Sequence, residues 1–201
     1  MDYPSQKLDS NTIYHLLTAL VTPRPIAWIS TLGPDGAANL APYSFFTVAS
    51  LAPPVLLVSQ VNPRSGSDKD TLRNLAANGE CVVNIVSHAL AVPMNASCAP
   101  LPYGDSEFAA AGLAPCASQW VAAPGVAEAR ARIECRLREL QRIGDGPMGG
   151  SLMLLDVLGI SVDDALLRDG VVDAAQLDVI GKLGGNGYST TRERFDMVRP
   201  G

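Results

Sequence analysis

The polar loop at residues 59–71, SQVNPRSGSDKDT, carries the groups best suited to binding an anion. Arg64 and Lys69 supply positive charge, and Ser59 and Thr71 supply hydroxyl donors, just ahead of a predicted helix. The free N–H groups at a helix N-terminus carry partial positive charge and add to such a site. A phosphate monoester fits this chemistry. The alternative is a solvated surface loop with a capped helix, and composition alone favours that alternative.

A second group of polar and aromatic side chains lies at residues 39–46, NLAPYSFF. Asn39, Tyr43, Ser44 and two phenylalanines bring together an amide, a phenol, a hydroxyl and two aromatic rings. A plain surface hairpin needs no such mixture, whereas a site for a flat aromatic molecule with polar edges does. This segment therefore predicts a ligand site.

Other catalytic chemistries lack their motifs in this chain. No Lys-Ser or Lys-Thr follows GDGPMGG, and no G-x-G-x-x-G opens a helix, which argues against a P-loop and against a Rossmann fold. No G-x-S-x-G elbow is present, and neither histidine lies in a recognisable pattern with a nucleophile. The four cysteines form no C-x-x-C pair, so we expect no metal site and interpret them as free, mostly buried thiols.

Composition indicates an acidic protein with enough apolar residues for one core. The chain has 201 residues, of which 47% are hydrophobic, and a net charge of −5 with a pI near 4.9. This charge argues against non-specific binding to nucleic acid or to an anionic membrane. The N-terminus shows no secretion signal, and no apolar run reaches the length of a membrane helix, so we expect a cytoplasmic protein. No linker divides the chain, and residues 1–201 are expected to form a single domain.

The segments that must position these groups are predicted to be mainly strands. Residues 26–32 and 37–40 flank Gly33-Pro34-Asp35-Gly36, and this pattern predicts a β-hairpin. Asp169-Gly170 predicts a second hairpin turn. Further strands are expected at residues 55–61, 81–86, 131–143 and 152–162. Charged and apolar side chains alternate in 131–143, which favours a strand there over a helix.

Helices are predicted between some of these strands. A short amphipathic helix is expected at residues 10–20, capped by Ser10 or Asn11. A second helix should follow the polar loop, with Asp68 or Asp70 as its cap, and should end at Asn78-Gly79. Shorter helices are expected at residues 88–97, with a break near Pro93, and at residues 105–113. Six or seven strands joined largely by hairpins predict a mostly β fold, an antiparallel β-barrel with helical insertions.

Five segments, taken in order, resemble a known family. They are PRPIAWISTLGPDGAANLAPYSFF, Ser59 with KDT at 69–71, GECVVNIV, MNAS at 94–97 and the late GKLGGNGY. Together they resemble the flavin reductase-like, FMN-binding split-barrel family, in particular its flavoredoxin-type members, over nearly the whole chain. The resemblance implies a homodimeric split β-barrel that holds FMN non-covalently near the dimer interface.

Position by position, the resemblance implies three groups of flavin-binding residues. Beside the isoalloxazine ring it implies Arg24, Pro25, Ile26, Trp28, Ser30, Asn39, Leu40, Ala41 and Ser44, with residues 39–44 acting largely through their backbone. Around the ribityl phosphate it implies Ser59, Arg64, Lys69, Asp70 and Thr71. It implies that the pocket is closed, in part from the partner subunit, by Met94, Asn95, Ser97, Lys182 and Tyr188. Trp28 also suits a place in the core, since strand aromatics commonly pack there.

The resemblance implies chemistry that takes place on the flavin, so no catalytic side chain is required. We expect an NAD(P)H:flavin oxidoreductase that uses NADH or NADPH and passes electrons to a free flavin, a flavin-dependent oxygenase or another acceptor. The alternative is an FMN-binding electron carrier or flavin-storage protein without NAD(P)H reductase activity. A split barrel that has lost its cofactor is a third interpretation, and the presence of Ser59, Lys69 and Thr71 argues against it.

Overall fold

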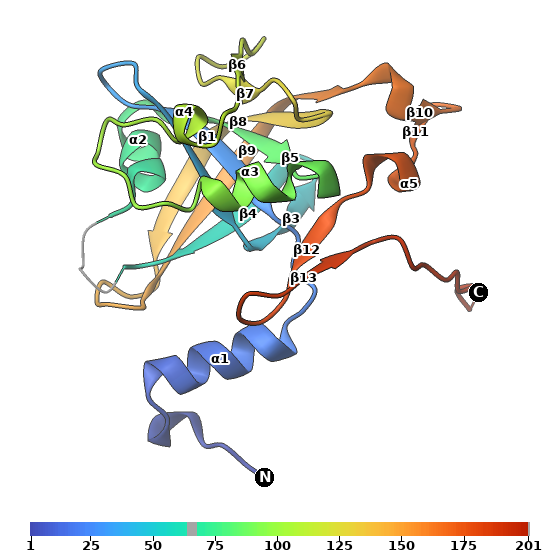
Figure 1. Cartoon of the computed structure of the whole chain (residues 1–201). Coiled ribbons are helices and arrows are strands. Elements are labelled where there is room, and N and C mark those ends of the chain that lie inside the picture. The colour runs from blue at the N-terminus through green and yellow to red at the C-terminus, as the bar shows by residue number, and fades with distance from the viewer. Residues whose placement is uncertain (64–67, 201) are drawn as a thin grey trace.

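The computed structural model describes residues 1–63 and 68–200, and its main feature is a seven-stranded sheet. All neighbouring strands of this sheet are antiparallel, in the order β2-β1-β5-β8-β9-β4-β3 (Figure 1). The strands are β1 (Ala27–Leu32), β2 (Ala38–Tyr43), β3 (Phe45–Leu51), β4 (Pro54–Val61), β5 (Glu80–Ile85), β8 (Ala131–Arg142) and β9 (Gly150–Val162). The predicted mostly β architecture is confirmed, including the strand that was preferred over a helix at 131–143.

The sheet curls into a barrel because a single residue joins its two edge strands. β2 and β3 lie at opposite ends of the strand order, yet only Ser44 separates Tyr43 from Phe45. The two edges must therefore meet at this point. The Tyr43 hydroxyl donates a hydrogen bond of 3.2 Å to Gln60 Oε1 on β4, next to β3. The predicted barrel with helical insertions is confirmed.

Alternating side chains of β1 separate two apolar clusters. Ala27 and Ile29 belong to the cluster that fills the barrel, together with Leu72 and Leu75 of the helix that follows β4. Trp28 belongs to a second cluster between the outside of the barrel and the short helices that cover it. Successive residues of a strand face opposite sides of a sheet, so one buried strand can serve both clusters. The Trp28 side chain is fully buried, which places it in the core.

Helices α1 (Ser10–Leu20) and α2 (Asp70–Asn78) lie where the sequence predicts them, but their caps differ from the prediction. The N-cap of α1 is Asp9, whose carboxylate accepts from the backbone N–H groups of residues 11 and 12. The N-cap of α2 is Lys69, and it makes no side-chain capping hydrogen bond. Gly79 ends α2 with a φ of 75°, a backbone conformation that glycine adopts without strain.

Short elements cover the barrel and extend from it. On one side lie η2 (His88–Leu90), α3 (Ala91–Ala96) and α4 (Glu107–Ala110), so the break predicted near Pro93 lies instead between η2 and α3 (Figure 1). The Asp169-Gly170 hairpin joins β10 (Leu167–Arg168) to β11 (Val171–Val172), as predicted. The remaining elements are η1 (Ser5–Lys7), β6 (Pro115–Cys116), β7 (Gly125–Val126), η3 (Asp164–Leu166), α5 (Ala174–Leu177), β12 (Ile180–Lys182) and β13 (Tyr188–Thr190). Among the described residues, no helix has the length and apolar character needed to cross a membrane.

Candidate ligand-binding site

A cavity of about 400 Å³ opens between β2, the first turn of α2 and the segment after α3. Ligand sites commonly have volumes of about 300–1,000 Å³. Six residues implied by the family resemblance line this cavity: Asn39, Ala41, Lys69, Asp70, Thr71 and Ser97. The fold therefore brings together residues from three distant parts of the chain, as the resemblance implies.

One ammonium group at the α2 end of the cavity has no carboxylate partner among the described residues. Lys69 Nζ lies 5.6 Å from the centre of the Tyr43 ring and makes no ion pair with any described residue. The two nearby aspartates are already paired, Asp68 with Arg142 at 2.6 Å and Asp70 with Arg73 at 3.3 Å. The ammonium of Lys69 and the N-terminus of α2 are thus left to attract an anion.

Asn39 links the strand side of the cavity to this helix. Its Oδ1 accepts hydrogen bonds from Thr71 Oγ1 at 2.9 Å and from Thr31 Oγ1 at 3.3 Å. Thr31 Oγ1 in turn accepts from Asn74 Nδ2 at 3.0 Å. All four side chains are buried, so the network fixes the distance between β2 and α2.

Glu107 completes the network, and sequence reasoning did not identify it. Its carboxylate accepts from Asn39 Nδ2 at 3.0 Å through both oxygens, and from the backbone N–H of Leu40 at 2.8 Å. Burial raises the pKa of Glu107, while the hydrogen bonds from Leu40 and Asn39 act in the opposite direction. The only signal in the sequence is an acidic residue in the first turn of a short helix, where acidic side chains are favoured by the helix itself.

The side chain of Arg24 serves the fold. Its guanidinium donates to the carbonyl oxygens of Thr18 and Val21 at 2.7 Å each, and to that of Leu183 at 3.1 Å. Nε donates to Ser44 Oγ at 3.3 Å. Arg24 thus joins the end of α1, the β2–β3 junction and the C-terminal hairpin, and it leaves little of its donor capacity for a ligand.

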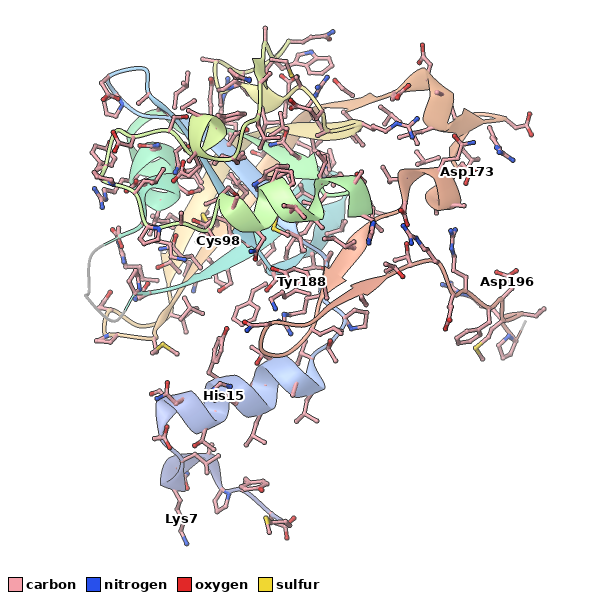
Figure 2. All side chains as sticks on the ribbon, viewed as in Figure 1. Lys7, His15, Cys98, Asp173, Tyr188 and Asp196 are labelled. Atoms are coloured by element: carbon pink, nitrogen blue, oxygen red, sulfur yellow. The ribbon has the colours of Figure 1, made fainter. Side chains whose placement is uncertain are left out.

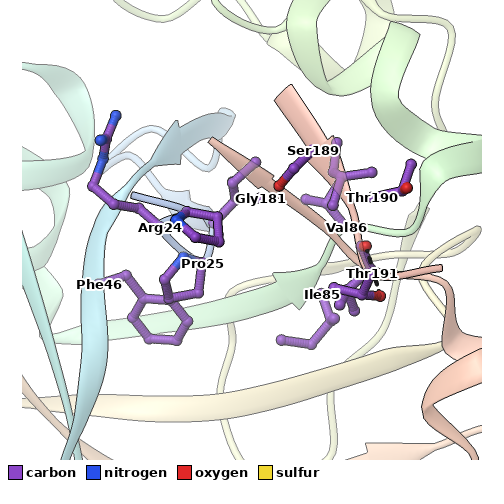
Figure 3. Close-up of a pocket in the computed structure, with 13 residues that line it drawn as sticks. Arg24, Pro25, Phe46, Ile85, Val86, Gly181, Ser189, Thr190 and Thr191 are labelled. Carbon is purple, nitrogen blue, oxygen red and sulfur yellow. Dashed lines mark hydrogen bonds between the residues drawn. The ribbon is translucent and has the colours of Figure 1, made fainter. Parts of the chain in front are cut away.

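Arg24, Pro25 and Ile26 line a different cavity, of about 300 Å³ (Figure 3). In this close-up, Pro25 and Phe46 lie on one side, and Ser189, Thr190 and Thr191 on the other. Its lining residues and those of the cavity at α2 do not overlap. The single chain therefore does not bring all the residues implied for the ring into one cavity.

Four of the implied residues have buried side chains and do not line the α2 cavity, namely Trp28, Ser30, Leu40 and Met94. Trp28 Nε1 donates to Ser97 Oγ at 2.9 Å, and Ser97 Oγ donates to the carbonyl of Met94 at 2.7 Å. Ser30 accepts from Asn84 Nδ2 and donates to the Pro124 carbonyl. Trp28 and Met94 therefore hold Ser97, which lines the cavity, from within the fold.

Lys182 and Tyr188 belong to the C-terminal hairpin β12–β13. Lys182 Nζ donates to the carbonyls of Gly185 and Gly187 and lies 4.4 Å from the centre of the Tyr188 ring. Tyr188 Oη donates to Asn95 Oδ1 of α3 at 3.4 Å. Figure 2 shows Tyr188 and Cys98 on the same side of the molecule. The hairpin is therefore held against the helix that borders the cavity at α2.

Of the residues implied for the phosphate, Ser59 does not line this cavity. It lies on β4 opposite Phe45 of β3. Arg64 lies outside the described residues. Among the described residues, no three His, Cys, Asp or Glu side chains are grouped so that they could hold a metal ion.

Comparison with known proteins agrees with this fold. A family model described as "Flavin reductase like domain" matches residues 20–176. The uncharacterized protein YwrF of Bacillus subtilis is 36% identical over 202 residues, which are 98% of each chain.

Solved structures extend this comparison. Nitrilotriacetate monooxygenase component B from Bacillus cereus superimposes with a TM-score of 0.93 and 33% identity over 98% of both chains. The 2-nitrobenzoate 2-nitroreductase of Pseudomonas fluorescens has a TM-score of 0.89 and 26% identity, covering 100% of this chain and 96% of its own. Flavoredoxin of Desulfovibrio vulgaris shares the fold, with a TM-score of 0.76 and 22% identity over 88% of this chain and 91% of its own.

Proposed function

The chain belongs to the flavin reductase like domain family, and we propose that it binds FMN non-covalently and acts as an NAD(P)H-dependent flavin reductase. One observation carries the proposal. Lys69 is the cation at the α2 cavity that has no carboxylate partner among the described residues, and it stands at the N-terminus of a helix. This arrangement suits a phosphate group, which distinguishes FMN from unphosphorylated flavins.

The residues present fit a bound FMN. The cavity volume of about 400 Å³ lies in the usual range for cofactor sites. Lys69 and Thr71 would hold the phosphate, and the edge of β2 from Asn39 to Tyr43 would lie along the ring. Ala41 and Pro42 give this wall little bulk, so a flat ring can approach the backbone.

FMN held by Lys69 and Thr71 would supply the capacity for hydride and electron transfer between a reduced nicotinamide and an acceptor. The protein's own part is to bind and orient the flavin. The network of Asn39, Thr71 and Thr31 holds β2 and α2 at a fixed separation. The C-terminal hairpin is held by Arg24 and by the hydrogen bond from Tyr188 to Asn95 of α3.

We infer that the acceptor is an oxygenase or a free flavin that carries electrons to one. The strongest support is the similarity to nitrilotriacetate monooxygenase component B. We also propose that the working form is a homodimer in the cytoplasm. The separation of the two cavities in a single chain supports the dimer, since a partner subunit could complete either one.

An electron carrier that is not reduced by NAD(P)H is the second candidate. The shared fold with flavoredoxin favours it. The two functions differ in one requirement, because a reductase must leave one face of the ring open to a nicotinamide.

Anaerobic addition of NADH, and separately of NADPH, to the FMN-loaded protein tests the proposal. If the protein is a reductase, the absorption bands of the bound flavin should bleach on mixing. With excess FMN in solution, the bleaching should continue over many turnovers. Bands that persist with both donors, but bleach with dithionite, would exclude the reductase and leave the electron carrier.

A further inference from the structure

The free edge of β2 requires a partner for its outward N–H groups, and Glu107 supplies it. β2 is an edge strand, so alternate residues direct their N–H and C=O groups away from β1. The hydrogen bond from the Leu40 N–H to Glu107 shows that Leu40 is one of these residues. Two residues further on, Pro42 has no N–H to donate. A single carboxylate therefore satisfies the backbone donor of this edge where it borders the cavity.

The same carboxylate fixes the orientation of the Asn39 amide. Both of its oxygens lie 3.0 Å from Asn39 Nδ2, so the amide NH₂ faces Glu107. Asn39 Oδ1 must then face Thr71 and Thr31, from which it accepts. Glu107 thus acts through Asn39 on Thr71, in the first turn of α2.

The partners of Glu107 indicate that it is ionised. Asn39 and Leu40 both donate, and a protonated carboxyl group would place its O–H against donors. At the cavity, Asp68 and Asp70 are paired with arginines, whereas Glu107 has no cationic partner among the described residues. No cationic side chain among the described residues therefore neutralises the negative charge of Glu107 in the cavity wall.

We propose that Glu107 is a positioning residue of the flavin site, which holds the β2 wall in its binding geometry and places a fixed negative charge in the wall of the cavity. This inference rests on the proposed function. The charge opposes the negative charge that a flavin gains on reduction, so it makes the bound flavin harder to reduce. The geometric role favours binding, and the electrostatic role lowers the reduction potential.

A comparison of Glu107→Gln with Glu134→Gln distinguishes these two roles from a general effect on protein stability. Glu134 is a matched control, since it is also buried and also accepts backbone N–H groups, those of Gln119 and Trp120, but lies outside the cavity lining. In Glu107→Gln, one acceptor is replaced by an NH₂ that faces another donor. We expect FMN binding to weaken about tenfold and the midpoint potential of the bound flavin to become more positive. Both quantities should stay at the wild-type values in Glu134→Gln.

Asn39→Ala provides a second variant that keeps the charge. It should weaken FMN binding and leave the midpoint potential nearly unchanged, and it tests the positioning role even if Glu107→Gln does not fold. Wild-type affinity in Asn39→Ala and Glu107→Gln would overturn the positioning role, and an unchanged potential in Glu107→Gln would overturn the electrostatic role. Equal effects in Glu134→Gln would reduce both to a general loss of stability. A wild-type protein that binds no FMN would instead overturn the proposed function, and this inference with it.

Discussion

Lys69 is the residue whose environment most directly suggests a function. It stands before the first turn of α2, and the aspartates on either side of it are paired with arginines. Neither aspartate is therefore left to neutralise the ammonium of Lys69. Here the fold directs the neighbouring carboxylates elsewhere and leaves the ammonium at the cavity, which is the arrangement that a phosphate site needs.

Replacing Lys69 with alanine should therefore weaken FMN binding. A hydrogen bond to a charged group contributes about 1.5–3 kcal/mol, so we expect a loss of roughly 10- to 100-fold in affinity. Quenching of flavin fluorescence measures the dissociation constant. Lys7→Ala, in the exposed η1 segment, serves as the control and should bind as the wild type does. An unchanged dissociation constant in Lys69→Ala would show that the phosphate lies elsewhere.

Sequence reasoning reached some site residues and missed others for a physical reason. Lys69, Asp70 and Thr71 are adjacent in the chain and precede a helix, so a local pattern suffices to identify them. Glu107 reaches Asn39 from 68 positions away, and no local pattern records that contact. Arg24 illustrates the opposite case, since its side chain is occupied by carbonyls of α1 and of the C-terminal hairpin.

At the scale of elements, β1 was predictable because a strand that is buried on both faces is a short apolar run bounded by turn residues. Ala27, Ile29 and Trp28 divide between two clusters, and both the inside and the outside of β1 are buried. Helix caps were less predictable. The cap of α1 is Asp9, one position before the first predicted candidate, and the cap of α2 is Lys69, between the two predicted candidates, because several polar residues in a row compete for the role.

Gly79 is an element boundary that can be tested by substitution. It ends α2 at a φ of 75°, with no atom near enough to meet an added Cβ. A non-glycine residue in this left-handed region costs about 1–2 kcal/mol, so Gly79→Ala should lower the free energy of unfolding by roughly that amount. Urea denaturation measures the change. Gly146→Ala is the matched control, because a Cβ there also meets no atom and its φ is not in the left-handed region. Equal stability of Gly79→Ala and wild type would contradict the cap assignment.

At the scale of the molecule, apolar side chains that are exposed in the single chain suggest a surface that a partner covers. Leu17 and Leu20 of α1 are 54% and 76% exposed, and Val48 and Leu51 of the edge strand β3 are 57% and 85% exposed. In Figure 1, α1 stands away from the barrel, with the C-terminal hairpin between them. A second copy of the chain is the simplest partner for such surfaces.

The dimer is therefore a prediction with a direct test. Light scattering coupled to size-exclusion chromatography should give twice the mass of the chain. Leu17→Asp combined with Leu20→Asp should shift the protein toward the monomer, because burying two carboxylates in an apolar interface is costly. His15→Asp, at an exposed position of the same helix, should leave the dimer intact. A monomeric wild type would contradict both the interface and a site completed by the partner.

The central claim is that the cavity between β2 and α2 holds a flavin by its phosphate, and titration of the flavin-free protein with FMN and with riboflavin tests it most directly. The two ligands share the same ring and differ in the phosphate. The account predicts that FMN binds at least about tenfold more tightly than riboflavin, as expected for one lost charge-assisted contact. Equal affinities, or no binding of either ligand, would contradict it.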